Sequence, residues 1–321
     1  MSDYAALEKR LADREVILLD GAIGTQLQSM GVPMADFAWA ALALHGHPYT
    51  VRRMHEMYIA AGVDIITTNT YASARHNLEP LGMVDQVAEL NLRAVMLAQD
   101  ARDKAAKDRP VLIAGSVSNF GLKTGQEAGT GSWSMARRRT ETSENQAKAN
   151  LRQQAEILAE AGVDFLIAES TGGNNHRKWV VEACVATGLP VWDGFKCRLD
   201  DGICKVGYSS DQTFEDGFDE VVALGGSVAA VFHSSIDATD AALDIVRDKW
   251  AGPIAVYPEA ERRDYVSVHR DEGAETPVGL DEFVAWAQTC VAGGVQIIGG
   301  CCGIEIDHIR PLRDALPTHL P

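Results

Sequence analysis

Residues 295–310 read VQIIGGCCGIEIDHIR, an apolar run that ends at two adjacent cysteines and continues into a helix-like segment. Glycines flank Cys301 and Cys302 on both sides. Neighbouring side chains on a regular strand point to opposite faces, so both thiols can face one point only where the strand has ended. We expect the glycines to permit this, because glycine adopts backbone conformations that are closed to other residues.

Two thiols directed at one point favour a metal site over a disulfide in this chain. The first residues, MSDYAALEKRLADREVILLD, form a charged helical lead-in without the apolar core of a signal peptide. No apolar run approaches the length of a transmembrane helix. We therefore expect a cytoplasmic protein whose six cysteines are reduced. A buried vicinal pair without function is the alternative, since free cysteine is among the most buried residue types.

The composition limits the classes of partner. The chain has 321 residues, of which 46% are hydrophobic, enough for one large barrel or two medium domains. Its net charge of −16 argues against nucleic acid or an anionic membrane as a partner.

Short apolar runs alternate with amphipathic helix-like segments along the whole chain. The predicted strands are 16–19, 64–68, 111–115, 164–168, 190–195, 228–232, 254–256 and 295–298. The predicted helices are 48–61, 85–106, 143–161, 174–187, 214–224, 238–250, 280–292 and 304–316. Eight strand–helix units fit a single (β/α)8 TIM barrel over residues 1–321. A doubly wound sheet is the runner-up, weakened by the absence of a G-x-G-x-x-G phrase after the first strand.

Residues suited to binding and catalysis, including a glycine that exposes its backbone, gather at the predicted strand ends, where barrel enzymes build their sites. They are Asp20 and Gly21, Tyr71, Glu169, His233, and the pair Cys301 and Cys302. Two long loops, about 117–143 and 257–280, leave the same rim. Loops of this length are typical of lids, binding loops or assembly arms. For each loop, a disordered segment without a function is an equal alternative.

Four phrases carry a resemblance to a known family. They are LLDGAIGTQL at 18–27, TTNTYAS at 67–73, FLIAE at 165–169 and IIGGCCGIEIDHIR at 297–310. From about Leu18 to about Leu312 the chain resembles the zinc-dependent homocysteine S-methyltransferases, which include the betaine–homocysteine and S-methylmethionine–homocysteine enzymes. The resemblance implies a (β/α)8 barrel with one zinc at the carboxyl rim of the strands, held by a cysteine after the sixth strand and two in GGCCG.

One position departs from the family pattern. Where the family has G-[IVL]-N-C after the sixth strand, this chain reads AVFHS at 230–234. His233 takes the place of the missing cysteine, and imidazole is a normal zinc ligand. We therefore expect zinc on His233, Cys301 and Cys302, in a complex that is neutral rather than singly negative. The alternative is that the metal is lost and His233 only hydrogen-bonds the substrate.

The resemblance implies an S-methyltransferase that moves a methyl group from a sulfonium or quaternary ammonium donor to the thiol of homocysteine, giving methionine. Zinc would hold the thiol as thiolate near neutral pH. The methyl on a cationic donor is already activated, so no catalytic residue beyond the metal is expected, and the remaining task is in-line positioning.

The same resemblance assigns the substrate contacts. Glu169 would bind the ammonium of homocysteine, with the Asp20-Gly21 turn presenting backbone groups to it. Trp39, in FAWAALALHGHP at 37–48, and Tyr71 are candidates for the aromatic faces that recognise an onium head. Glu169 could instead pair with a basic neighbour at the rim, and each aromatic could instead belong to the core.

Two rival functions remain. One is a catabolic demethylase of onium compounds with another thiol acceptor. The other is a non-catalytic zinc and thiol redox sensor, in which Cys301 and Cys302 cycle between zinc-bound and oxidised states. A sensor needs no amino-acid pocket, so the presence of Asp20, Glu169 and Tyr71 favours an enzyme. The methyl donor and assembly into a homo-oligomer are left open.

Overall fold

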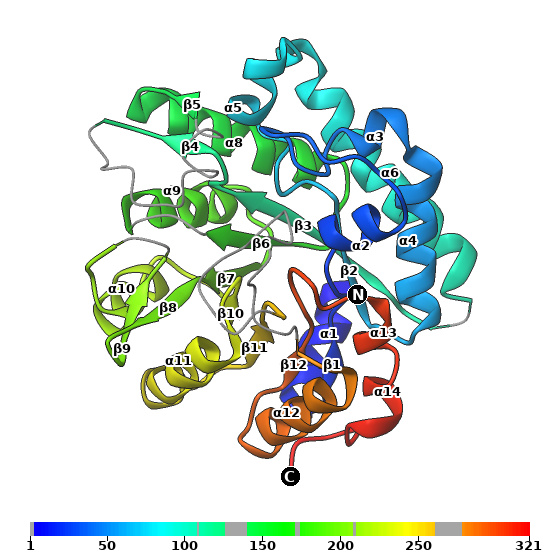
Figure 1. Cartoon of the computed structure of the whole chain (residues 1–321), viewed down its shortest axis with the longest axis vertical. Helices are drawn as coiled ribbons and strands as arrows, with labels where there is room; N and C mark the ends of the chain where they lie inside the picture. The colour runs from blue at the N-terminus through cyan, green and yellow to red at the C-terminus, as the bar shows by residue number, and fades with distance from the viewer. Residues whose placement is uncertain (1–2, 108, 126–139, 171–173, 208–209, 261–277) are drawn as a thin grey trace.

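Eight parallel strands form the centre of the computed structural model, which describes residues 3–107, 109–125, 140–170, 174–207, 210–260 and 278–321 (Figure 1). They are β1 (Ile17–Leu18), β2 (Ile65–Thr67), β3 (Leu112–Ser118), β6 (Phe165–Ser170), β7 (Val191–Phe195), β10 (Val228–Phe232), β11 (Ile254–Tyr257) and β12 (Ile297–Ile298). The sheet order is β1-β12-β11-β10-β7-β6-β3-β2, and a parallel bridge between Leu19 and Ile65 closes it. The predicted (β/α)8 barrel is therefore confirmed, and the doubly wound sheet is wrong.

Helices surround the strands (Figure 1). They are α1 (Asp3–Ala12), α2 (Gly24–Ser29), α3 (Ala43–Gly46), α4 (Pro48–Ala60), α5 (Arg75–Leu78), η1 (Glu79–Leu81), η2 (Val84–Gln86), α6 (Val87–Ala105), α8 (Glu144–Glu160), α9 (Asn174–Val185), α10 (Phe214–Val222), α11 (Ile236–Lys249), α12 (Leu280–Ala292), α13 (Ile306–Ile309) and α14 (Leu312–Ala315). The predicted helix at 304–316 is thus two short helices. Pro311 separates them, because proline lacks the N–H that would continue the first one.

Helix α1 closes the amino-terminal end of the barrel. Its Tyr4, Leu7 and Leu11 belong to the same buried cluster as the inward-facing strand residues. The indole Nε1 of Trp192, on β7, donates a hydrogen bond to the Tyr4 hydroxyl (3.1 Å). With this end sealed, the carboxyl ends of the strands are the end at which a site can form.

Two small sheets lie outside the barrel. The strands β4 (Leu122–Lys123) and β5 (Thr140–Glu141) pair at the base of the predicted loop 117–143, while β8 (Cys197–Asp200) and β9 (Ile203–Val206) form an antiparallel hairpin. Residues 126–139 of the first predicted loop and 261–277 of the second lie outside the described residues. A lid or binding role for these loops therefore stays a prediction.

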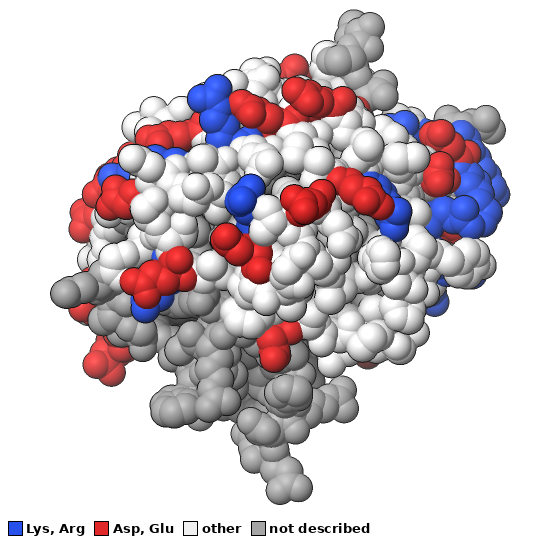
Figure 2. All heavy atoms as spheres, turned by 90° about the horizontal axis from the view of Figure 1, so that it is seen from above, with Lys and Arg blue, Asp and Glu red and all other residues white. Residues whose placement is uncertain are grey.

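The acidic excess is spread over the surface in the view of Figure 2. Asp and Glu side chains are scattered among uncharged residues on this face, and Lys and Arg side chains gather mainly at one edge. Among the described helices, none combines the length and apolar character needed to cross a membrane.

A carboxylate is buried between the barrel and its helices at Asp193. Trp192 faces the barrel interior, so Asp193, its neighbour on β7, faces the helix layer. Its side chain is 1% exposed, and no described residue donates a hydrogen bond to either oxygen. Burial raises the pKa of Asp193 to about 7, which the guanidinium of Arg177 opposes. An ionised Asp193 therefore destabilises the folded state.

We expect Asp193→Asn to remove this penalty. The folded-state pKa exceeds the unfolded value of about 3.9, so stability falls as pH rises from about 4 through 7. The free energy of unfolding of the variant should exceed that of the parent by at most roughly 4 kcal/mol above pH 7 and by little near pH 4. Urea unfolding of both proteins at pH 4.5, 6 and 8 measures the difference. A difference that does not change with pH would contradict this assignment.

Candidate active and metal site

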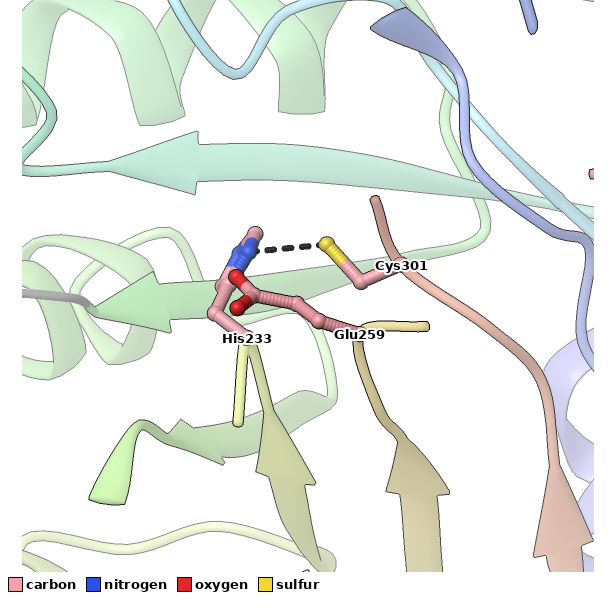
Figure 3. A group of neighbouring side chains, drawn as sticks. All are labelled: His233, Glu259 and Cys301. Carbon is pink, nitrogen blue, oxygen red and sulfur yellow. Dashed lines mark hydrogen bonds between the residues drawn. The ribbon is translucent and has the colours of Figure 1, made fainter. Parts of the chain in front are cut away.

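Three neighbouring strand ends bring a histidine, a glutamate and a cysteine together (Figure 3). His233 follows β10, Glu259 lies two residues beyond β11, and Cys301 lies beyond β12. One ligand atom from each, a ring nitrogen, a carboxylate oxygen and the thiol sulfur, lie within 4.8 Å of one another. The side chains are 6%, 2% and 5% exposed, respectively. A metal-sized group of donors is therefore buried at the carboxyl rim, where the sequence predicted it.

Backbone hydrogen bonds between these segments fix the donors relative to one another. The amide of Glu259 donates to the carbonyl of Ser234 (2.8 Å), and the amide of Cys301 donates to the carbonyl of Pro258 (2.7 Å). Each segment is thus tied to the next one around the rim, and the donor group is organised before any ligand binds.

The paired cysteines converge as predicted. Their sulfur atoms lie 3.8 Å apart. Two thiolates on a tetrahedral zinc, each at about 2.3 Å from the metal, are separated by about 3.8 Å. Cys301 is buried and Cys302 is partly exposed, so Cys301 forms the inner part of the pair and Cys302 its outer part.

The flanking glycines serve two different purposes. Gly303 adopts a left-handed conformation (φ +79°), as expected for a residue that turns the chain after the pair. Gly299 and Gly300 do not, and the expectation of unusual backbone conformations is wrong there. A Cβ at Gly299 would lie 2.6 Å from the Tyr257 ring, and one at Gly300 would lie 2.0 Å from the Ile304 side chain. Close packing explains these two.

His233 faces a different partner with each ring nitrogen. Its Nδ1 lies 2.9 Å from the sulfur of Cys301, and its Nε2 lies 3.1 Å from a carboxylate oxygen of Glu169. A carboxylate against the far nitrogen of a ligating histidine orients the ring and raises its basicity. The backbone of His233 is left-handed (φ +50°), a strained conformation that is typical of functional positions.

Among the residues that the structure describes around this cluster, acidic groups outnumber cations. Burial raises the pKa of Asp20 to about 8, and the charge of Glu169 adds to this effect. The hydrogen bonds from Thr67 act in the opposite direction and lower this pKa. Burial also raises the pKa of the Cys301 thiol well above its usual value, and Cys302 and Glu259 add to the effect. A cation also lies nearby: Nζ of Lys196 is 3.9 Å from a carboxylate oxygen of Glu259. A bound divalent cation would offset this negative charge and ionise the thiols, so the residues fit a metal such as zinc.

A pocket opens in front of the donor group. Its wall includes the aromatic residues Trp39, Tyr71, Phe120 and Tyr257, together with Glu169 and Glu259. The Tyr71 ring lies 5.1 Å, centroid to centroid, from both the His233 and the Phe120 rings. The pocket therefore places aromatic faces beside acidic groups and thiols, which suits a cationic ligand.

The Trp39 side chain fits into the pocket wall because residue 24 is a glycine. A Cβ at Gly24, the first residue of α2, would lie 1.8 Å from the indole nitrogen of Trp39. The second glycine of the phrase LLDGAIGTQL thus leaves the space that the indole occupies. Trp39 also has a left-handed backbone (φ +44°), a second strained position at this site.

The structure brings most of the predicted site residues together. The pocket is lined by His233, Cys301, Cys302, Glu169, Trp39 and Tyr71. Asp20 and Gly21 lie behind it. The Asp20 carboxylate accepts hydrogen bonds from the Thr67 amide (2.7 Å) and hydroxyl (3.0 Å), and the carbonyl of Gly21 accepts one from the Tyr257 hydroxyl (2.8 Å).

Sequence analysis missed Glu259, Tyr257 and Phe120. All three fall inside the stretches predicted as long loops, 117–143 and 257–280. The available signal was their position within a few residues of a strand end, because the carboxyl ends of barrel strands supply the site.

Comparison with known proteins gives consistent matches over nearly the whole chain. A family model described as homocysteine S-methyltransferase matches residues 17–316. Homocysteine S-methyltransferase of Escherichia coli (strain K12) is 29% identical, over 98% of this chain and 99% of that protein. Selenocysteine methyltransferase of Astragalus bisulcatus is 27% identical, over 94% and 92%. The crystal structure of the metallated form of the homocysteine methyltransferase MmuM from E. coli superposes with a TM-score of 0.72, at 24% identity, over 97% of this chain and 98% of that one.

Proposed function

The chain belongs to the homocysteine S-methyltransferase family, and from this premise we propose that it transfers a methyl group from a sulfonium or quaternary ammonium donor to the thiol of homocysteine, giving methionine. The observation that carries the proposal is one pocket that holds both a buried thiol–imidazole donor group and an aromatic wall. A thiol acceptor needs the first and an onium donor needs the second.

The residues that would hold zinc are His233, through Nδ1, and the paired cysteines. Zinc bound there supplies a Lewis acid that keeps the acceptor thiol ionised near neutral pH. Glu169 would accept the hydrogen bond from Nε2 of His233 and so fix which ring nitrogen faces the metal. Lys196 donates a hydrogen bond to the carbonyl of His233 and would help to hold its strained backbone in place.

The acceptor's amino-acid end is assigned to the part of the pocket wall next to His233. Glu169 is the carboxylate that would bind the ammonium. Asp20 would act as a positioning residue, since it binds Thr67, whose side chain lines the pocket. Gly21 would likewise shape the wall through Tyr257 rather than touch the substrate.

The donor is assigned to the aromatic wall. A fully methylated ammonium or sulfonium head has no hydrogen-bond donor, so aromatic faces must recognise it. Trp39 and Tyr71 would provide these faces, joined by Phe120. Because the leaving group departs as a neutral amine or thioether, no general acid is required, and the pocket would act by holding donor and acceptor in line.

A methyl-transfer assay tests this function. Reduced protein with a measured metal content is incubated with homocysteine and, in turn, S-methylmethionine, S-adenosylmethionine, betaine and dimethylsulfoniopropionate, and methionine is quantified. We expect about one zinc per chain and methionine from at least one donor. Protein that holds no metal after growth with zinc and reductant, or metal-loaded protein that yields no methionine from any donor, would overturn the proposal.

The same assay separates the rival functions. Acceptors other than homocysteine, including selenocysteine because two relatives are named for it, are compared by kcat/KM. A higher value for another thiol with an onium donor would identify the demethylase. Zinc release on oxidation without methyl transfer would identify the sensor, for which the aromatic wall has no use.

A further inference from the structure

We infer that Glu259 is a ligand of the bound metal, so that the protein's donor set combines nitrogen, oxygen and sulfur. The inference rests on the proposed function and deepens its metal site. The carboxylate of Glu259 forms a close group of donors with His233 and Cys301, and Cys302, whose sulfur lies 3.8 Å from that of Cys301, would complete a set of four. Figure 3 shows the three side chains converging on one point.

The order of the strands determines where Glu259 lies. β11 lies between β10 and β12, so the residue beyond its end stands between His233 and Cys301. The amide hydrogen bond from Glu259 to Ser234 anchors its backbone to the segment that carries His233. Its side chain is 2% exposed. The carboxylate is therefore held toward the donors and away from water.

Charge gives an independent argument. Three thiolates on zinc make a complex with a charge of −1, whereas two thiolates and an imidazole make a neutral one. A carboxylate ligand restores the charge of −1. Glu259 thus supplies the negative charge that His233 does not. In the absence of a metal, Lys196, at 3.9 Å from its oxygen, offsets the charge of Glu259, and this explains how a carboxylate can be buried there.

An oxygen donor has two consequences. It makes the site harder, so that metals other than zinc, such as Co²⁺, bind more readily than at an all-sulfur site. It also occupies a position that the acceptor's sulfur needs, because zinc sites of this kind bind four donors. The acceptor and Glu259 therefore compete for the metal.

Metal titration of Glu259→Gln tests the inference. The apparent Kd for Co²⁺ and Zn²⁺ is measured by competition with a chromophoric chelator, and the visible bands of the Co²⁺ protein report its ligands. We expect the Gln variant to bind both metals at least about tenfold and up to about 100-fold more weakly, because an amide is a poorer ligand than a carboxylate. Its Co²⁺ bands should shift, and homocysteine should perturb them at a lower concentration than in the parent.

Asp193→Asn is the matched control, since it makes the same carboxylate-to-amide change at a buried residue of β7 outside the donor group; its Kd should equal that of the parent. A Gln variant with the parent's Kd and Co²⁺ bands would overturn the inference but leave the proposed function intact. Parent protein that binds neither metal would overturn the metal site as a whole. If the Gln variant does not fold, the same measurements are made on Glu259→Asp. The aspartate carboxylate is one methylene too short to reach the metal, so an unchanged Kd and unchanged Co²⁺ bands would show that Glu259 is not a ligand.

Discussion

His233→Ala is expected to leave a folded protein that has lost its metal and at least about 10³-fold of its kcat/KM for methyl transfer. The imidazole stands between the sulfur of Cys301 and the carboxylate of Glu169, so its removal deletes a metal donor and leaves Glu169 without this hydrogen-bond partner. A free thiol is only a few per cent ionised at pH 7, which accounts for about 30-fold. The rest of the loss comes from an acceptor that is no longer held in line with the donor.

The fold should survive the change, because the left-handed backbone at this position costs any residue with a Cβ only about 1–2 kcal/mol, which is small against the stability of the whole barrel. Metal content and kcat/KM are measured on the same preparation. His233→Cys is the informative control, as it supplies the thiolate typical of the family. It should keep about one zinc and lose no more than about tenfold in kcat/KM. An alanine variant that retains its full metal content would show that His233 is not a ligand.

The barrel was predictable because each part of it leaves a local signal. Buried parallel strands read as short apolar runs, and the covering helices read as amphipathic segments, so the eight strands were all found to within a few residues. The site was predictable to the extent that it lies at strand ends. His233, Glu169 and the paired cysteines each follow an apolar run directly, and the barrel rule places them on one rim.

What could not be predicted depends on packing that the sequence does not display. The hairpin β8–β9 lies outside the barrel, yet Cys197 and Cys204 are 0% and 9% exposed because their strands pack against α10 and α11. The sequence around Glu259 resembles that of a solvent-exposed loop. The residue is buried because its segment packs between the ends of the neighbouring strands. Asp20 belongs to the family phrase, but its carboxylate is fully buried and binds Thr67 instead of facing the pocket.

Replacing Glu169 should separate two roles that the structure gives to one carboxylate. Glu169 is the penultimate residue of β6, lines the pocket and lies 3.1 Å from Nε2 of His233. Glu169→Ala loses both the support of the imidazole and the counter-ion of the acceptor's ammonium. We expect metal affinity to fall about 10- to 100-fold, and kcat/KM for homocysteine to fall by about 10³-fold.

Glu169→Gln retains an oxygen that can accept the hydrogen bond from His233 but carries no charge. Its metal affinity should stay within a few-fold of the parent's, while KM for homocysteine rises about 10- to 100-fold, the value of a hydrogen bond to a charged group. The acceptor 4-mercaptobutyrate, which is homocysteine without its amino group, should be used equally well by parent and Gln variant. Equal use of 4-mercaptobutyrate would show that the Glu169 carboxylate acts on the substrate only through the ammonium. If the Gln variant instead prefers homocysteine over 4-mercaptobutyrate as strongly as the parent does, another residue binds the ammonium.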